Sequence, residues 1–470
     1  MKTLFLGVDQ GSHASRALLF DERGNEVASA YEDVNLNRLK DGCVEQNAVQ
    51  LITSVKNVIN KVLQSVKAGH IAGCGIATQR SSVLSWNTEG VARSPVLSWQ
   101  DVRGSELVTA LQPHGANIQN ISGLPLSAHY GASKMRWLLD NIPAGGDTSN
   151  HINLSPLVSY LLYHLLDTKP CLVDHSNAQR TQLMDINTLD WSARLTQWFG
   201  VPEQLLPECI PIVADYGVLA ASGIPVTAVC GDQNAALSGA GRLSENTALV
   251  NLGSGAFVLR TLSENRPSKN QLSSVAYSDD KTVQYVREAT INGAGSALAW
   301  LGNKYHIDRI QERLPEWLKT VDKPLLFINT IGGLGSPWWR QDIEADFIGE
   351  DQGNEGALVI AVVESIIFMV RANLDLMMSE SPLTKLRVSG GLARLDGLCQ
   401  KLANLCALSV ERGDITEATA RGVAWLAAGR PAHWMRSEFM ENFIPVVDEK
   451  LSQRYLQYMA ALNLKLRVGV

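Results

Sequence analysis

An aspartate that follows an apolar run is the first residue in this chain with an evident chemical use. In VCGDQNAAL (229–237) the apolar run ends at Cys230, Gly231 makes a turn, and Asp232 stands where a helix is predicted to begin. Ligands of α/β sheets gather at the carboxyl ends of strands, so this carboxylate is well placed for chemistry. An aspartate at a helix start also commonly caps the helix by accepting backbone N–H groups. On this motif alone, the cap is the favoured interpretation.

Two Gly-Ser turns, one near the start and one near the middle of the chain, could bind phosphate. GVDQGSHASRALLFD and TALVNLGSGAFVLRTL share one layout, in which two apolar strand-like runs flank the turn. Backbone N–H groups of such a turn can approach phosphate oxygens, and Ser12, His13 and Ser254 could add donors. Asp9 could hold a water-coordinated Mg²⁺ between nucleotide phosphates. Either turn alone is more typical of an ordinary hairpin, and the repetition makes phosphate binding an equal alternative.

A glycine pair could form part of a nucleotide site. Gly390 and Gly391 follow the apolar run LRVS and precede a predicted helix. Bare backbone at this point would let a flat nucleobase or a ribose pack closely. The same pair is typical of a tight strand-to-helix connection, and both interpretations stay open.

The elements that must position these residues alternate between strands and helices. Buried strands are predicted at 71–78 and 224–230, and a helix at 48–63 with Asn47 as its N-cap. Further helices are predicted at 357–376 and at 418–429, the latter with Gly429 as its C-cap. This order is typical of α/β layers. The repeated hairpin divides the chain into two halves that join around residues 235–245.

Length and composition exclude several classes of protein. Domains hold about 100–200 residues, so the 470 residues predict two or three of them. The 41 basic and 47 acidic side chains give a net charge of -6, which argues against a nucleic-acid partner. The apolar start is too short for a signal peptide, and Glu364 interrupts the most apolar later stretch, so no membrane partner is expected. The 7 cysteines form no CxxC pair, which indicates a reducing, cytoplasmic setting, and a homodimer is expected on base rates.

A series of motifs that spans most of the chain resembles the FGGY family of carbohydrate kinases, and its glycerol kinase branch most closely. These motifs are GVDQGSHASRALLFD, TQRSSVLSW, SWQDVR, SKMRWLLDN, SNAQRTQLMDINTLDW, CGDQNAAL, NLGSGAF, GLGSPWW, VSGGLAR and EATARGVAWLAAG. The resemblance implies an α/β fold in which two RNase H-like domains of the actin-like ATPase type flank a deep cleft. It implies an N-terminal domain at 1–240 with the acceptor site, and a C-terminal domain at 241–470 with the adenosine site and an extension after about 430.

The resemblance also implies a role for individual residues. Asp232 would be the general base and contact the substrate, while Gln233, Arg80 and Trp99 would hold substrate hydroxyls. Asp9 would organise Mg²⁺ through water. The residues implied to bind the ATP cofactor are Gly11, Ser12, His13, Arg16, Gly253, Ser254, Gly255, Gly295, Gly390 and Gly391.

Two departures from the glycerol kinase pattern fall on the acceptor side. Ser81 stands where glycerol kinases typically have an acidic residue, and His129 stands where they have a tyrosine. The expected function is therefore an ATP-dependent kinase that phosphorylates a hydroxyl of a small polyol or sugar, with an altered acceptor site. The alternatives are a ketose kinase of the xylulokinase or ribulokinase type and a non-catalytic, actin-like nucleotide-binding regulator. Retention of Asp232 disfavours the regulator.

Overall fold

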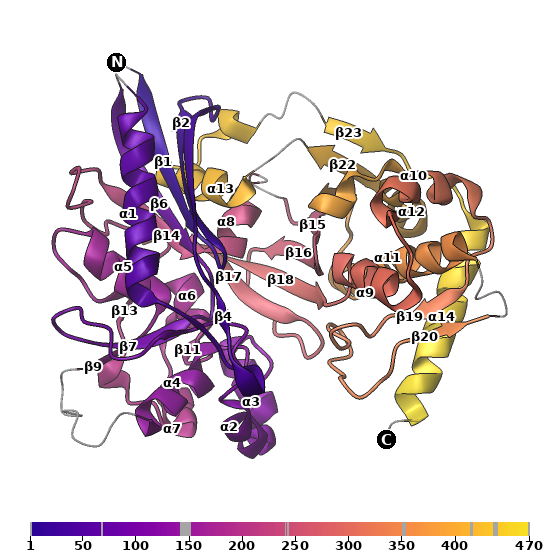
Figure 1. The fold of residues 1–470 in the computed structure, drawn as a ribbon, viewed down its shortest axis with the longest axis horizontal. Coiled ribbons are helices and arrows are strands. Elements are labelled where there is room, and N and C mark those ends of the chain that lie inside the picture. The colour runs from indigo at the N-terminus through magenta and orange to yellow at the C-terminus, as the bar shows by residue number, and fades with distance from the viewer. Residues whose placement is uncertain are drawn as a thin grey trace.

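The chain folds into two lobes that stand side by side (Figure 1). The computed structural model describes residues 2–66, 69–141, 152–239, 241, 244–349, 354–413, 417–435 and 440–468. Ala240, at the predicted domain boundary, lies outside the described residues. Each lobe is built around one large sheet, and the two sheets share a common core topology.

The sheet of the first lobe has the strand order β14-β6-β1-β2-β3. Its strands are β1 (Thr3–Gln10), β2 (Ala14–Asp21), β3 (Glu26–Asp33), β6 (His70–Thr78) and β14 (Val226–Gly231). The pairs β1–β2 and β2–β3 are antiparallel, whereas β1–β6 and β6–β14 are parallel. The near-continuous burial of β6 and β14 fits parallel strands that are covered on both faces. Both strands predicted here from apolar runs are confirmed.

The sheet of the second lobe has the order β17-β18-β16-β15-β21-β22-β23. Its strands are β15 (Thr247–Leu252), β16 (Ala256–Leu262), β17 (Leu272–Ser278), β18 (Val283–Ile291), β21 (Lys385–Ser389), β22 (Ser409–Gly413) and β23 (Met440–Phe443). Within it, β18-β16-β15-β21-β22 repeats the order and the strand directions of the first sheet. The duplication predicted from the two Gly-Ser hairpins is therefore confirmed, and so is the two-domain α/β fold.

The remaining elements cover these sheets. The first lobe adds a second sheet with the strand order β4 (Asn37–Arg38), β5 (Val44–Gln46), β8 (Val96–Leu97), β7 (Val83–Asn87) and β9 (Ile152–Pro156). It also has two two-stranded sheets, in which β10 (Leu172–Asp174) pairs with β13 (Glu208–Ile210) and β11 (Met184–Asp185) pairs with β12 (Asp190–Trp191). Its helices are α1 (Ala48–Gln64), α2 (Ser105–Ala110), α3 (Gly115–Ser122), α4 (Gly131–Asp140), α5 (Leu157–Leu165), α6 (His175–Gln179), α7 (Ala193–Phe199) and α8 (Asp232–Gly239). The second lobe adds the ribbon β19–β20 (Leu326–Ile328, Asp346–Ile348) and helices α9 (Gly295–Tyr305), α10 (Ile310–Thr320), α11 (Glu355–Glu380), α12 (Asp396–Cys406) and α14 (Glu449–Val468). As predicted, Asn47 caps α1, because its side chain accepts the backbone N–H of Gln50.

Helix α11 is the central core helix of the second lobe. By length and composition alone it could cross a membrane, but 94% of its most apolar window is buried inside the fold. Glu364, which interrupts this apolar stretch, is buried and paired with Lys401 and Arg454. The helix predicted at 357–376 is confirmed as a core element.

Helix α13 (Ala418–Ala427) returns from the second half of the chain to the first sheet. Ala420, Val423 and Ala424 belong to the core that β1 and β6 form. A Cβ added at Gly422 would stand 1.8 Å from the backbone oxygen of Ala235, so bare backbone lets α13 lie directly on α8. The helix ends at Ala428 as C-cap, and the predicted cap, Gly429, follows one residue later with φ of 78°. The domain boundary at residue 240 stays a prediction. Helix α13 follows that boundary in the sequence but packs on the sheet of the first lobe.

Candidate active site

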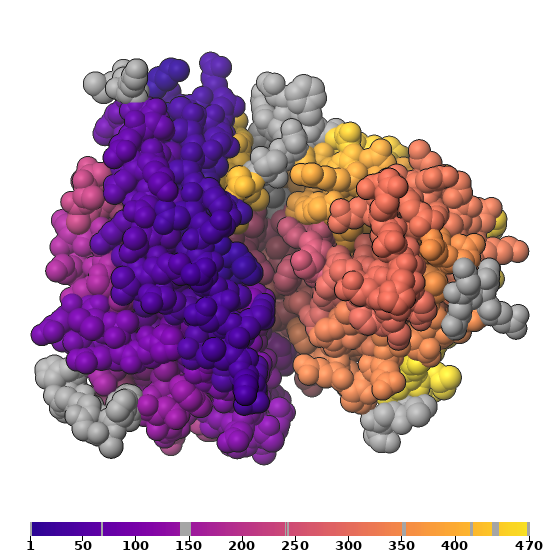
Figure 2. Space-filling view, viewed as in Figure 1, coloured from indigo at the N-terminus to yellow at the C-terminus, as the bar shows by residue number. Residues whose placement is uncertain are grey.

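A cleft separates the two lobes, and Figure 2 shows it from one face. The carboxyl ends of three adjacent strands of the first sheet carry the candidate polar residues. Asp9 lies near the end of β1, Arg80 follows β6, and Asp232 follows β14. Since these strands are mutually parallel, their ends meet at one edge of the sheet.

Asp232 is the first residue of α8, as predicted. Its Oδ1 accepts the backbone N–H of Gln233 at 2.7 Å, and its side chain is 33% exposed. Oδ1 also lies 3.6 Å from Nε of Arg80. Desolvation within the fold raises the pKa of this carboxyl, while the guanidinium of Arg80 opposes the rise. The carboxylate therefore sits between a helix start and a cation and still has a face open to solvent.

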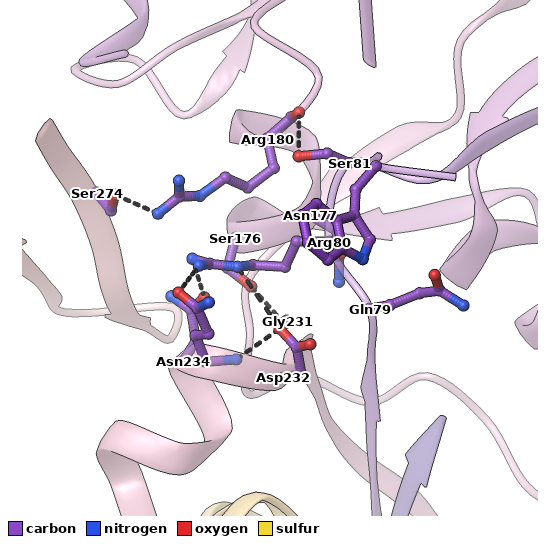
Figure 3. A network of polar contacts seen from close by, with 12 residues as sticks. Gln79, Arg80, Ser81, Ser176, Asn177, Arg180, Gly231, Asp232, Asn234 and Ser274 are labelled. Atoms are coloured by element: carbon purple, nitrogen blue, oxygen red, sulfur yellow. Dashed lines mark hydrogen bonds and ion pairs between the residues drawn. The ribbon is translucent and has the colours of Figure 1, made fainter. Parts of the chain in front are cut away.

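Arg80 is the centre of the polar network drawn in Figure 3. Its side chain is buried, with Nη1 donating to Oδ1 of Asn234 at 3.2 Å and Nη2 donating to Oε1 of Gln233. Nη2 also lies 3.7 Å from Oε1 of Glu288. The structure thus brings together Arg80, Asp232 and Gln233, three of the residues predicted to hold the acceptor.

The sequence did not single out two further members of this network, Arg180 and Glu288. Nη2 of Arg180 donates to Oε2 of Glu288 at 2.5 Å and to Oγ of Ser274 at 2.9 Å. Both charged side chains are only 4% exposed. The adjacent charges Arg287 and Glu288 within the strand segment VQYVREATI were the available signal, because charged side chains that become buried require partners.

Ser81 lies beside this network in an unusual backbone conformation. Its φ is 64°, which non-glycine residues rarely adopt, and its buried hydroxyl donates to the backbone oxygen of Arg180 at 3.2 Å. Figure 3 shows this contact, with Arg180 above Ser81 and Arg80 below. Ser81, which the sequence predicts to lie in the acceptor site, therefore also holds the backbone of Arg180 in place.

Trp99 and His129 form a second group, next to the first hairpin. Nε1 of Trp99 donates to Oγ of Ser12 at 2.9 Å, and the rings of Trp99 and His129 lie 5.4 Å apart. His129 reaches solvent, but the protein around its ring and the nearby Lys134 lower its pKa to about 3. The imidazole is therefore neutral at physiological pH, and it can donate from one nitrogen and accept at the other.

The first hairpin places Asp9 and Arg16 opposite each other on β1 and β2. Nη1 of Arg16 lies 3.7 Å from Oδ2 of Asp9 and 3.5 Å from Oε2 of Glu417. Burial raises the pKa of Asp9 to about 7, and the negative charge of Asp232 adds to the rise. At the turn, the N–H of Gly11 donates to the backbone oxygen of Ala14 at 2.9 Å. His13, at the tip, is exposed.

The second hairpin likewise joins its two strands through three residues, 253–255, and it contacts the start of α9. The N–H of Gly253 donates to the backbone oxygen of Gly255 at 2.9 Å. The N–H of Gly295 donates to the oxygen of Gly253 at 3.0 Å, and that of Ala294 donates to the oxygen of Ser254 at 3.0 Å. Three of the residues predicted to bind the nucleotide, Gly253, Ser254 and Gly295, are therefore in direct contact.

The two glycines after β21 have different surroundings. Gly390 has φ of 94°, and a Cβ there would stand 2.5 Å from the backbone oxygen of Leu252. At Gly391, an added Cβ would meet nothing within 4 Å. Gly390 is thus required for the connection itself, whereas Gly391 leaves open space.

Substitution of each glycine tests its role separately, in nucleotide binding for Gly391 and in folding for Gly390. We expect Gly391→Leu to weaken ADP binding by about 10-fold or more without lowering the free energy of unfolding, because its side chain would fill open space where the family resemblance predicts nucleotide contacts. We expect Gly390→Ala to destabilise the fold by about 2 kcal/mol or more, since the new Cβ meets backbone at a positive φ. Calorimetric titration with ADP and chemical unfolding measure the two effects. Wild-type ADP affinity in Gly391→Leu would show that Gly391 does not line the nucleotide site.

The fold and the paired hairpins define a class, the actin-like ATPases with two RNase H-like domains. Residues 4–239 match the N-terminal domain of the FGGY family of carbohydrate kinases, and residues 248–429 match its C-terminal domain. The chain belongs to the FGGY family of carbohydrate kinases.

Individual relatives agree with this assignment. Glycerol kinase 1 of Pseudomonas aeruginosa is 31% identical over 479 residues, which cover 98% of this chain and 96% of that protein. The crystal structure of Plasmodium falciparum glycerol kinase with ADP has a TM-score of 0.91 at 25% identity and covers 99% of this chain and 98% of that one. A xylulose kinase structure from Lactobacillus acidophilus, with a TM-score of 0.87, 18% identity and 98% of each chain covered, shows the shared fold alone.

Family membership establishes the kind of reaction. The chain is an ATP-dependent carbohydrate kinase, a phosphotransferase with an alcohol group as acceptor, and it is similar to glycerol kinases. The alternative of a non-catalytic regulator is therefore not supported.

Proposed function

We propose that this kinase transfers the γ-phosphate of ATP to a hydroxyl of a small polyol or sugar at an acceptor site that differs from that of glycerol kinases. The observation that carries the proposal is the position of Asp232 beside Arg80 and Gln233, at the edge where β14 and β6 end. A carboxylate next to hydroxyl-binding groups is the arrangement that proton removal from an alcohol needs.

Asp232 would act as the general base of the transfer. As the acceptor oxygen bonds to the γ-phosphorus, its proton passes to the carboxylate of Asp232, and the bond from phosphorus to the β,γ-bridging oxygen breaks to release ADP. The hydrogen bonds from Arg80 to Gln233 and Asn234 fix the guanidinium so that it can orient the acceptor hydroxyls. The protein supplies position and charge, which is most of what phosphoryl transfer requires.

The nucleotide would lie between the two hairpins, with Asp9 and Arg16 on one side and Gly253, Ser254 and Gly255 on the other. Asp9 also fits a Mg²⁺ ion, because its carboxylate is buried and the negative charge of Asp232 acts on it, a repulsion that a cation would reduce. Within the described residues no group of three or more His, Cys, Asp or Glu gathers as metal ligands, so the ion would be held largely by water and phosphate oxygens. Bound there, Mg²⁺ would neutralise charge on the phosphates.

The acceptor site would differ from that of glycerol kinases at Ser81 and His129. Ser81 offers no carboxylate, and its hydroxyl donates to the backbone oxygen of Arg180. A site that leaves one acceptor hydroxyl without its partner loses about 1–3 kcal/mol of binding free energy. We therefore expect the preferred acceptor to be a polyol or sugar other than glycerol.

A coupled ADP-release assay over glycerol, tetritols, pentitols, ketopentoses and ketohexoses tests this proposal. We expect at least one acceptor to be phosphorylated with a kcat/KM well above that of glycerol. Preference for a ketopentose would favour the ketose-kinase alternative, and preference for glycerol would contradict the altered acceptor site.

Restoring the acidic residue provides a second test. We expect Ser81→Glu to raise kcat/KM for glycerol by about 10-fold, because the new carboxylate can accept hydrogen bonds from glycerol hydroxyls. The double variant with His129→Tyr should raise it further. If glycerol turnover is unchanged in both variants, these two positions do not determine acceptor choice.

We also infer that the enzyme works in the cytoplasm, and a homodimer stays an expectation from base rates. All 7 cysteines lie within the described residues and are free thiols, which is typical of a reducing compartment. Size-exclusion chromatography with light scattering measures the oligomeric state.

A further inference from the structure

Glu288 is a buried acidic residue of the second lobe whose carboxylate contacts residues of the first lobe. It lies in β18, paired with Leu259 of β16 in the sheet of the second lobe, and its side chain is buried. Its two carboxylate oxygens contact residues of the first lobe, Arg180 after α6 and Arg80 after β6. Burial of a carboxylate costs several kcal/mol unless it is paired, so these contacts are required wherever Glu288 stays ionised.

Two guanidiniums keep Glu288 ionised and depend on it in turn. Burial raises the pKa of Glu288, but Arg180 and Arg80 lower it more, so the net pKa lies below the usual range. Burial and the positive charge of Arg180 both disfavour the charged form of Arg80. Without the carboxylate, the two arginines would repel each other, and Arg80 would lose one of the contacts that fix its orientation beside Asp232.

The strand that carries Glu288 also leads directly to the second phosphate hairpin. Its last residue, Ile291, pairs with Ala256 at the base of that hairpin. The next residues continue the contact, since the N–H groups of Ala294 and Gly295 donate to the backbone oxygens of Ser254 and Gly253. One continuous segment, 288–295, therefore contacts Arg80 and Arg180 at one end and the hairpin assigned to the nucleotide at the other.

We propose that Glu288 is a positioning residue that couples the nucleotide hairpin of the second lobe to the acceptor-binding arginine of the first. The inference rests on the proposed function, because that function assigns Arg80 to the acceptor and Gly253–Gly255 to the nucleotide. A nucleotide that holds the hairpin and β18 in place also holds Glu288, and Glu288 holds Arg80. Such coupling is reciprocal, so a bound acceptor strengthens nucleotide binding by the same factor.

Hydrogen exchange with ADP as the only ligand tests the coupling. We expect ADP to slow amide exchange in residues 78–82 and 176–182 of the wild-type enzyme, and we expect Glu288→Gln to abolish this slowing while ADP still protects residues 253–255. Unchanged slowing at 78–82 in Glu288→Gln would overturn the proposal, as would its absence from the wild type. Because no acceptor is present, this result is independent of whether the acceptor and the base have been assigned correctly.

A matched variant separates coupling from the general cost of removing a buried carboxylate. Glu364 in α11 is 2% exposed and also pairs with two cations, Lys401 at 3.0 Å and Arg454 at 2.7 Å. We expect Glu364→Gln to lower the free energy of unfolding and to leave the ADP effect at 78–82 intact. If Glu288→Gln does not fold, Glu288→Asp replaces it, since the shorter side chain keeps the charge but withdraws from Arg80. Full wild-type coupling in Glu288→Asp would equally contradict the proposal.

Discussion

Asp232→Asn is expected to reduce acceptor-dependent ADP release by about 10²- to 10⁴-fold, the range that a positioned general base contributes. The amide keeps the shape of the carboxylate and can still accept the N–H of Gln233, but it cannot take the proton of the acceptor hydroxyl. Nucleotide binding should stay within a few-fold of wild type, because Asp232 does not belong to either hairpin. Steady-state kinetics and calorimetric titration with ADP measure the two effects.

Asp375→Asn provides the control for this substitution. Asp375 lies on α11 in the second lobe, where it pairs with Arg371, accepts a hydrogen bond from the Tyr455 hydroxyl at 3.0 Å and is 39% exposed. We expect this variant to retain wild-type turnover, since the pair is partly solvated and contributes about 1 kcal/mol or less to stability. Full turnover in Asp232→Asn would show that another group accepts the proton.

Gly422→Ala is expected to destabilise the protein by about 3 kcal/mol or more. The added Cβ would stand 1.8 Å from the backbone oxygen of Ala235 and would therefore force α13 away from α8. Backbone atoms cannot rotate aside as a side chain can, so the whole helix must shift. Because α8 begins at Asp232, we also expect the shift to lower kcat. Chemical unfolding followed by circular dichroism measures the loss.

Gly302→Ala is the matched control, since it makes the same change inside helix α9. There the added Cβ would stand 3.2 Å from the side-chain Cδ1 of Ile310 and 3.3 Å from a backbone oxygen, so the neighbours must give by only a few tenths of an ångström. Helix propensity favours alanine by about 1 kcal/mol, which offsets this crowding. Equal stabilities of the two variants would contradict the close approach of α8 and α13.

The sequence predicted the parts of the structure that depend on neighbouring residues. Apolar runs around each Gly-Ser turn predicted both hairpins, and Asn47 predicted the start of α1, because a cap and a turn are determined within a few residues. The motif at 229–237 predicted a strand that ends just before Asp232. It favoured a helix cap for Asp232; in the structure Asp232 is the first residue of α8, its Oδ1 accepts the N–H of the next residue, Gln233, and the same oxygen lies 3.6 Å from Nε of Arg80, a partner that no local pattern contains.

What the sequence did not predict depends on residues that are far apart along the chain. Arg80, Arg180 and Glu288 meet only because α6 and β18 fold against the end of β6. No spacing rule joins such positions in a single sequence. Likewise, the apolar pattern of α13 predicted a helix but not the sheet that it would cover. Small residues such as Gly422 allow close packing but do not specify the partner element.

Analysis of the acceptor after incubation with ATP tests the central claim most directly. Mass spectrometry and phosphorus NMR of the best acceptor from the screen should show one phosphomonoester formed for each ADP released by the wild-type enzyme. In Asp232→Asn, both products should fall together. ADP release without a phosphorylated acceptor, or equal product formation by wild type and Asp232→Asn, would contradict the account.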